Sequence, residues 1–185
     1  MSARRLWTIA CTLAVAIAVA ACGQTGQPTS ILNNGVYVEA GQITYQLQVS
    51  RELNPFTVED RQYLAGLPAG TSSANANQLW YGVFLWAKNQ TKHPQRTADS
   101  FDIIDSNGDR FSPLKLDPAV NGFAWTGTTL QPAATQPAPN TTASFGPTQG
   151  GLLLFKLPIS VYSNRPLTLQ INAPSGGKGE ISLDL

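Results

Sequence analysis

Apolar and polar residues alternate strictly between Ile43 and Val49, in the run ITYQLQV. Successive side chains of a β-strand point to opposite faces, so this alternation predicts a strand with one buried and one wet side. The apolar set would face the core: Ile43, Tyr45, Leu47 and Val49. The same alternation of apolar and polar residues recurs in later segments, which are separated by Pro and Gly residues, and it predicts an all-β fold.

The other predicted strands are short and bounded by turn residues. A second strand covers 79–88 (LWYGVFLWAK), and Asn107-Gly108 between two apolar runs predicts a hairpin. One short helix is expected within 55–67, capped by Thr57 and ended by Gly66. About seven or eight strands with so little helix predict an antiparallel β-sandwich. The remaining predicted strands are 101–105, 110–112, 122–126, 151–157, 167–172 and 180–185.

The N-terminal segment predicts where the protein is located. Arg4 and Arg5 precede an apolar run, Leu6 to Ala21, that is shorter than the roughly 20 residues of a membrane-spanning helix. Val19-Ala20-Ala21-Cys22 resembles the lipobox of bacterial lipoproteins, and this resemblance implies cleavage before Cys22 and acylation of that residue. Two or more acyl chains give stable attachment to a membrane. An ordinary signal peptide and a retained signal anchor are the alternatives.

The lipobox interpretation divides the chain into a signal peptide (1–21), a lipidated Cys22 with a flexible tether (22–34) and one domain (35–185). Cleavage removes Cys11 and lipidation occupies Cys22, so the mature chain would have no disulfide. It would also keep ten basic against eleven acidic residues, scattered singly. Without a basic stripe, nucleic acid is not an expected partner. The predicted location is the extracytoplasmic side of the cell membrane.

Two stretches of the chain carry a family resemblance. The run YGVFLWAKNQTKHPQRTADSFDIIDSNGDRFSPL resembles the central segment of an Ig-like domain of unknown function found in secreted bacterial lipoproteins. LLLFKLPISVYSNRPLTLQI is similar to a later strand of that family. The resemblance implies an Ig-like sandwich in the cell envelope and no catalytic residues. The matching positions are Asn89, Phe101, 105–108, Phe111, Pro113, Phe155 and Pro158.

Two other stretches depart from the family pattern. One is the segment 51–68, and the other is the Pro-, Thr- and Ala-rich stretch within 127–150. A loop as long as the second one is functional or mobile in most compact domains. Its composition predicts a solvated excursion over the surface.

Few residues suggest chemistry. His93 is the single histidine and follows a strand in a polar turn, which argues against Ser-His machinery and zinc sites. Adjacent Glu59 and Asp60 fit a helix N-terminus, where the helix dipole favours acids. A group of acidic and amide residues fails the EF-hand spacing and fits a hairpin turn instead: Asp102, Asp105, Asn107 and Asp109. The sequence therefore predicts no catalytic residue, metal or cofactor, and a protein that is not an enzyme. A carboxylate pair assembled from distant strands is the enzyme alternative.

The strand at 79–88 is apolar on both faces, which leaves two interpretations. One face carries Leu79, Tyr81, Val83, Leu85 and Ala87, and the family pattern, counted back from Asn89, implies that this face lies in the core. The other face carries Trp80, Phe84 and Trp86, with Gly82 between the rings. The strand is either wholly buried beneath the stretch 127–150, or it exposes an aromatic patch of the kind that marks partner and ligand sites. In the second case Gly82 would leave a shallow slot for a flat ligand.

These observations give two hypotheses about function. The first is a membrane-anchored, non-enzymatic interaction module that binds another component of the bacterial envelope. The alternative is a lipoprotein that binds a small ligand, lipid or glycan through Trp80, Phe84 and Trp86. In both, the membrane is contacted through the lipid on Cys22.

Overall fold

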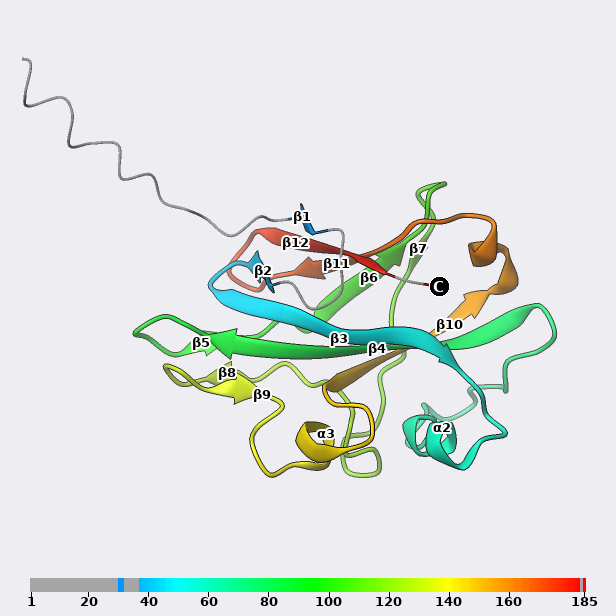
Figure 1. The fold of residues 1–185 in the computed structure, drawn as a ribbon, viewed down its shortest axis with the longest axis horizontal. Helices are drawn as coiled ribbons and strands as arrows, with labels where there is room; N and C mark the ends of the chain where they lie inside the picture. The colour runs from blue at the N-terminus through cyan, green and yellow to red at the C-terminus, as the bar shows by residue number, and fades with distance from the viewer. Residues whose placement is uncertain (1–29, 32–36, 184) are drawn as a thin grey trace, which may run out of the picture.

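Two large β-sheets, one two-stranded sheet and a covering layer make up the described part of the fold (Figure 1). The structure is a computed structural model that describes residues 30–31, 37–183 and 185. The predicted signal peptide and Cys22 lie outside the described residues. Of the predicted tether, Ser30–Ile31 are described: they form β1 and pair in parallel with the strand β12 (Lys178–Leu183). The end of the tether is therefore held against the domain.

The first sheet has the strand order β1-β12-β11-β6-β7. Its strands occupy the predicted stretches: β6 is Ser100–Ile104, β7 is Arg110–Phe111, and β11 is Leu167–Asn172. Except for β1, neighbouring strands are antiparallel. The predicted hairpin is confirmed, because β6 and β7 pair across the turn that contains Gly108.

The turn between β6 and β7 is organised by the carboxylate of Asp105. Its Oδ1 accepts hydrogen bonds from the backbone N–H groups of Asn107 (2.9 Å) and Asp109 (3.0 Å), and its Oδ2 accepts one from Asn164 Nδ2 (3.0 Å). Burial alone raises the pKa of Asp105, but these hydrogen bonds outweigh it and hold the pKa below its ordinary value. The acidic residues of this turn thus have the structural role expected of a hairpin.

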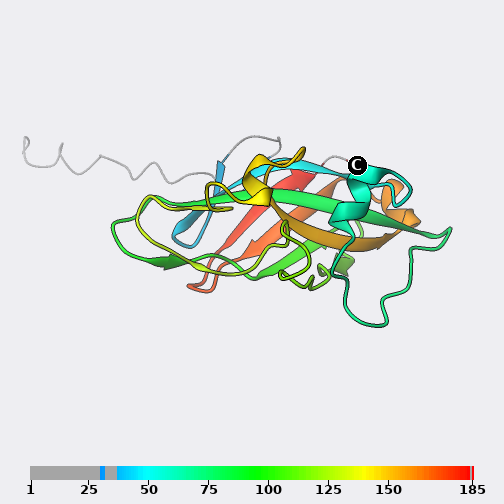
Figure 2. The same ribbon diagram turned by 90° about the horizontal axis from the view of Figure 1, so that it is seen from below.

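The second sheet has the order β10-β4-β3-β2, and the two-residue strand β9 (Thr135–Gln136) continues the pairing at the end of β4. The bounds are Tyr37–Ala40 for β2, Ile43–Leu53 for β3, Gln78–Asn89 for β4 and Gly151–Pro158 for β10. Figure 2 shows the strands of the first sheet running obliquely to β3 and β4. A 3-10 helix, η1 (Ile159–Tyr162), follows β10.

One prediction for β3 is wrong, because this strand contains a bulge. Leu47 pairs with Leu85, yet Val49 pairs with Phe84, so Gln48 is an extra residue. An inserted residue reverses which side chains face which side of the sheet. Ile43, Tyr45 and Leu47 therefore lie in the core between the sheets, whereas Val49 packs on the outer face.

The main hydrophobic core lies between the sheets and joins every long strand. From β4 it takes the alternating set that begins at Leu79 and ends at Ala87, as predicted. Phe155 of β10 and Ile103 of β6 meet it from the two sheets, and each is fully buried. With antiparallel sheets packed face to face around this core, the fold is an all-β sandwich, as the sequence predicts.

A second hydrophobic cluster lies on the outer face of β4, beneath a layer that we call the cap. The cap consists of α2 (Val58–Tyr63), residues 114–124 and α3 (Thr142–Phe145), and Figure 1 shows both helices on the side of β3 and β4 opposite the first sheet. Tyr63 and Phe123 of the cap pack against Leu53, Trp80 and Phe84 of the sheet. The protein therefore buries both faces of β4 over part of its length.

Two expectations about the cap region are wrong. Residues 122–126 form no strand, since only Ala124 makes an isolated bridge, to Leu152. The stretch 127–150 is not a purely solvated loop: it contains β8 (Thr129–Leu130), which pairs with β5 (Gln95–Arg96), as well as β9 and α3. Leu130 and Ala143 of this stretch are buried and hold it against the domain, whereas Phe145 is 71% exposed.

An ion pair fastens α2 to β3. The predicted helix is confirmed, with Thr57 Oγ1 accepting from the N–H of Asp60 (3.2 Å). Arg51 of β3 donates to Asp60 Oδ1 (2.6 Å) and Oδ2 (3.1 Å), and the N–H of Asn54 donates to Oδ2 (2.7 Å). Burial alone raises the pKa of Asp60, but the hydrogen bonds and the Arg51 charge outweigh it and lower the pKa below its ordinary value of 3.8.

This lowered pKa predicts acid sensitivity. Because the unfolded carboxylate binds a proton at a higher pH than the folded one, the stability that Asp60 contributes is present above the ordinary pKa and is lost as the pH falls below it. We expect the free energy of unfolding to be level near neutrality and to fall below about pH 4–5. The free energy of unfolding, measured by urea denaturation at several pH values, should fall less steeply with decreasing pH for Asp60→Asn than for the wild type. An equal dependence on pH in the two proteins would contradict this role of Asp60.

Candidate functional site

The structure divides the predicted aromatic face into a buried part and an accessible part. Trp80 is 3% exposed and Phe84 is 0% exposed, because the cap covers them. The predicted slot at Gly82 is also filled: a Cβ there would lie 3.1 Å from Leu53 Cδ1 and from Phe84 Cε2. The prediction that Trp80 and Phe84 belong to an exposed patch is therefore wrong. Trp86, beyond the cap, is half-buried and borders a small hollow.

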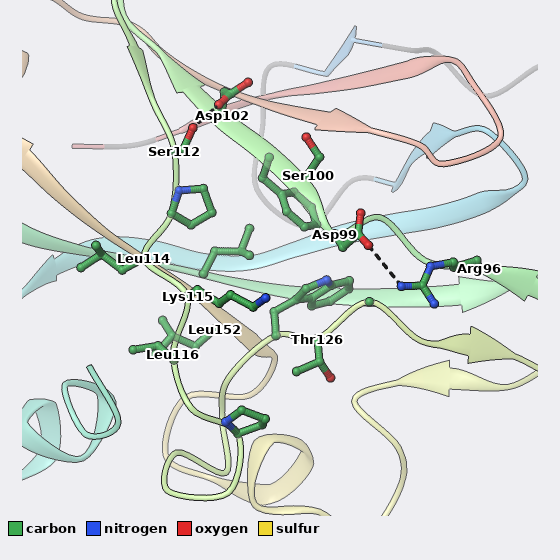
Figure 3. Close-up of a pocket in the computed structure, with 16 residues that line it drawn as sticks. Arg96, Asp99, Ser100, Asp102, Ser112, Leu114, Lys115, Leu116, Thr126 and Leu152 are labelled. Carbon is green, nitrogen blue, oxygen red and sulfur yellow. Dashed lines mark hydrogen bonds and ion pairs between the residues drawn. The ribbon is translucent and has the colours of Figure 1, made fainter. Parts of the chain in front are cut away.

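A groove of about 600 Å³ lies at one side of the sandwich. The groove opens where the chain leaves β7. From there the chain crosses from the first sheet to the second, and Leu114 pairs with Leu154 of β10. Figure 3 shows Leu114, Leu116 and Leu152 close together, with Asp102 on β6 and Asp99 just before that strand. We call it the edge groove.

Trp125 lines the edge groove, and a hydrogen bond and an aromatic contact hold its ring in place. Its ring meets Phe101 edge to face, with centroids 5.7 Å apart. Its Nε1 donates to the carbonyl of Ala98 (2.8 Å), while the N–H of Ala98 donates to Tyr45 Oη (2.7 Å). Burial raises the pKa of Tyr45 to about 12. Two aromatic side chains thus satisfy both backbone groups of Ala98 and fix the wall of the groove.

Close backbone approach at two glycines makes room for this arrangement. A Cβ on Gly151 would lie 2.6 Å from Trp125 Cε3, and a Cβ on Gly127 would lie 2.7 Å from Asp99 Cβ. Larger residues at either position would displace the groove wall. The sequence offered no local signal for this, because Gly127 and Gly151 gain their role only when the strands are assembled.

Charges of both signs line the rim of the edge groove. Arg96 Nη2 pairs with Asp99 Oδ2 (3.1 Å), as the dashed line in Figure 3 marks, and both side chains are half-exposed. Asp102 Oδ1 accepts from Ser112 Oγ (2.7 Å), and its Oδ2 lies 3.5 Å from Arg110 Nη1. Lys115 is exposed and has no ion-pair or hydrogen-bond partner within the part of the chain that the structure describes.

One flank of β6 lacks a strand neighbour beside the edge groove. β11 pairs with β6 along its whole length, but β7 pairs only with Ile103 and Ile104 on the other side. Ser100, Phe101 and Asp102, which line the groove, therefore have no strand beside them on that flank among the described residues. An uncovered strand edge is a template for an added strand.

The other candidate residues lie apart from the edge groove. His93 is exposed, as predicted, and its carbonyl accepts a hydrogen bond from Asn89. Glu59 is at the N-terminus of α2 and lies 3.3 Å from Arg51. Within residues 37–183, no three His, Cys, Asp or Glu side chains gather as a possible metal site. No helix of the described residues is both long and apolar enough to cross a membrane.

Comparisons with known proteins support the fold. The yjhA protein from Bacillus subtilis aligns with a TM-score of 0.56 at 14% identity, over 83% of this chain and 100% of that one. A "putative lipoprotein (ycdA)" from Bacillus subtilis aligns with a TM-score of 0.51 at 13% identity, over 82% of this chain. This chain spans only 39% of the length of ycdA.

An uncharacterized beta-sandwich protein from Clostridium difficile 630 aligns over 88% of this chain and 98% of its own, with a TM-score of 0.45 and 13% identity. No protein-family model matches the sequence, and a search among curated proteins finds no relative. At identities of 13–14%, the likeness to yjhA and ycdA concerns the fold alone. The Ig-like lipoprotein family and the lipid on Cys22 stay predictions.

Proposed function

We propose that this protein is a membrane-anchored, non-enzymatic interaction module of the bacterial cell envelope, and that its edge groove binds an extended segment of another envelope protein. The observation that carries the proposal is the uncovered flank of β6 beside an apolar floor. A peptide added there gains main-chain hydrogen bonds from the strand and places alternate side chains on Trp125 and the leucines. The lipobox at Cys22 supports the location.

The rim of the edge groove supports a peptide as the ligand. Asp99, Asp102, Arg96 and Lys115 present both signs of charge, which suits a segment with mixed side chains better than a polyanion. The carboxylates of Asp99 and Asp102 are already engaged by arginines, so they suit positioning more than proton transfer. This engagement favours binding over catalysis as the role of the groove.

The position of β1 supports an outward-facing groove. β1 pairs with β12 at one end of the first sheet, whereas the edge groove adjoins β6 and β7 at the other end. Seven residues lie between Cys22 and Ser30, and the eight steps along the chain can span at most about 28 Å. A lipid on Cys22 would therefore keep the β12 edge near the membrane and leave the groove facing away from it.

Photo-cross-linking in intact cells tests the proposal. A photoreactive amino acid is placed at Lys115 in the groove or at Lys178 on β12, since both lysines are exposed. We expect the Lys115 probe to capture one protein at a single extended peptide, and the Lys178 probe not to capture that peptide. Cys22→Ala should abolish the capture, because the protein would no longer be held at the membrane.

Three outcomes would contradict the proposal. Capture of the same peptide from both positions would mean that the edge groove does not select it. Capture that persists with Cys22→Ala would mean that binding of the partner does not need the membrane anchor. If the Lys115 probe captures no protein in cells that display the folded lipoprotein, the edge groove has no protein partner.

A further inference from the structure

We propose that the outer face of β2, β3 and β4 beside Trp86 is a second binding site, which takes an uncharged β-linked saccharide of three or more rings. This site is separate from the edge groove and does not depend on it. The hollow has a volume of about 350 Å³. Its lining combines aromatic, amide and hydroxyl side chains: Tyr37, Thr44, Gln46, Gln48, Trp86, Lys88, Thr135 and Gln149, with Ala87 beside them.

The strand register places the two aromatic residues in one row. Tyr37 pairs with Gln46, and Gln46 pairs with Trp86, so the three residues cross three neighbouring strands on one face. Neighbouring strands lie about 4.8 Å apart, which separates the positions of Tyr37 and Trp86 by roughly 10 Å. Two aromatic rings at this separation can each support one ring of a straight oligosaccharide.

The chemistry of the lining matches a sugar better than an apolar ligand. The C–H faces of a sugar ring pack on aromatic side chains, and its hydroxyl groups need donors and acceptors. Gln46 lies between the rings, and Gln48 Nε2 donates to Gln46 Oε1 (3.0 Å), which orients the two amides together. The bulge at Gln48 places this amide beside the row. Tyr37 is 48% exposed, so its ring is available for contact.

The charges around the hollow favour an uncharged ligand. Lys88 pairs in register with Thr44, and Thr44 pairs with Glu39, so a cation and an anion occupy the two ends of the neighbouring row. Opposite charges at the two ends leave no net charge that would select an anionic or cationic polymer. Uncharged saccharides therefore fit this face best.

Isothermal titration calorimetry on the full chain, purified in detergent, tests the site. Cellotetraose and chitotetraose are the β-linked probes, and maltotetraose is the curved, α-linked comparison. We expect at least one β-linked probe to bind, and Trp86→Ala to weaken it at least about tenfold, which is the loss of roughly 1.4 kcal/mol. Tyr37→Ala should weaken it about threefold to tenfold, since its ring supports another sugar ring.

Two variants control for folding and for unspecific stacking. The indole Nε1 of Trp86 is buried and has no hydrogen-bond partner in the described part of the chain. Trp86→Phe keeps an aromatic face and removes this donor, so it should fold normally and bind within about threefold of the wild type. Phe56→Ala removes an aromatic ring that is 91% exposed at another place and should leave binding unchanged.

The proposal is overturned if neither β-linked probe gives binding heat with the folded wild type, or if Trp86→Ala binds as tightly as the wild type. Maltotetraose binding as well as the β-linked probes would overturn the choice of ligand geometry. None of these results depends on the Lys115 cross-link. The saccharide site and the peptide groove can therefore fail separately.

Discussion

Phe84→Ala is expected to lower the free energy of unfolding by about 3–5 kcal/mol. Phe84 is 0% exposed although it points away from the main core, because the cap buries it. Tyr63 meets its ring edge to face, with centroids 5.0 Å apart. Removing the ring leaves a cavity between α2 and the sheet that the surrounding strands cannot close. Chemical denaturation followed by circular dichroism measures the loss.

Phe56→Ala is the matched control for Phe84→Ala. The same ring is removed from the same domain, but at a position that is 91% exposed, so the loss should stay within about 0.5 kcal/mol. Equal losses for the two variants would mean that the cap does not cover β4. That outcome would restore Trp80 and Phe84 as an accessible aromatic face.

The two-sided apolar pattern of β4 shows how far sequence reasoning reaches. A run such as LWYGVFLWAK predicts a strand, and the family pattern, counted back from Asn89, correctly assigns the alternate residues from Leu79 to Ala87 to the main core. Parity alone does not say how far a cap extends over the other face. The cap ends between Phe84 and Trp86, and this limit depends on α2, α3 and residues 114–124, which are distant in sequence.

The bulge at Gln48 could not be predicted for a related reason. The alternation from Ile43 to Val49 is unbroken in the sequence, yet the register shifts between Leu47 and Val49. Because of the shift, the first half of β3 packs into the main core, whereas Val49 and Leu53 pack into the hydrophobic cluster beneath the cap. The pattern ITYQLQV carries no glycine or proline to mark the change, so only the pairing with β4 exposes it.

The candidate sites were harder to predict than the strands. Trp125 and Lys115 were not predicted as site residues, because the edge groove is built from segments around 96–102, 112–118, 125–127 and 152–153. None of these segments is a motif by itself. Trp86 was predicted, since a large aromatic residue on a second face is visible in the sequence, but its row with Tyr37 and Gln46 requires the register of three strands.

Replacing the amide nitrogen of Asn89 by an oxygen, as in Asn89→Asp, is expected to have a large effect on the free energy of unfolding. Asn89 is 0% exposed at the end of β4. Its Nδ2 donates to the carbonyls of His93 (2.8 Å) and Leu130 (3.0 Å), and its Oδ1 accepts from the N–H (2.9 Å) and the hydroxyl (2.8 Å) of Thr91. One side chain thus ties the turn after β4 to β8, at the position where the family resemblance places an Asn.

Asn89→Asp should lower the free energy of unfolding by about 3–5 kcal/mol at neutral pH, because a buried carboxylate would face two carbonyl oxygens. Asn89→Ala should cost less, about 1–3 kcal/mol, since it removes the hydrogen bonds of the amide without adding a charge. Burial and the carbonyls would raise the pKa of the new carboxyl in the folded state above its unfolded value. The Asp variant should therefore regain stability as the pH falls toward about 5, opposite in sign to the contribution of Asp60. Denaturation at both pH values measures this. An Asp variant as stable as the Ala variant at neutral pH would contradict the donor role of the amide.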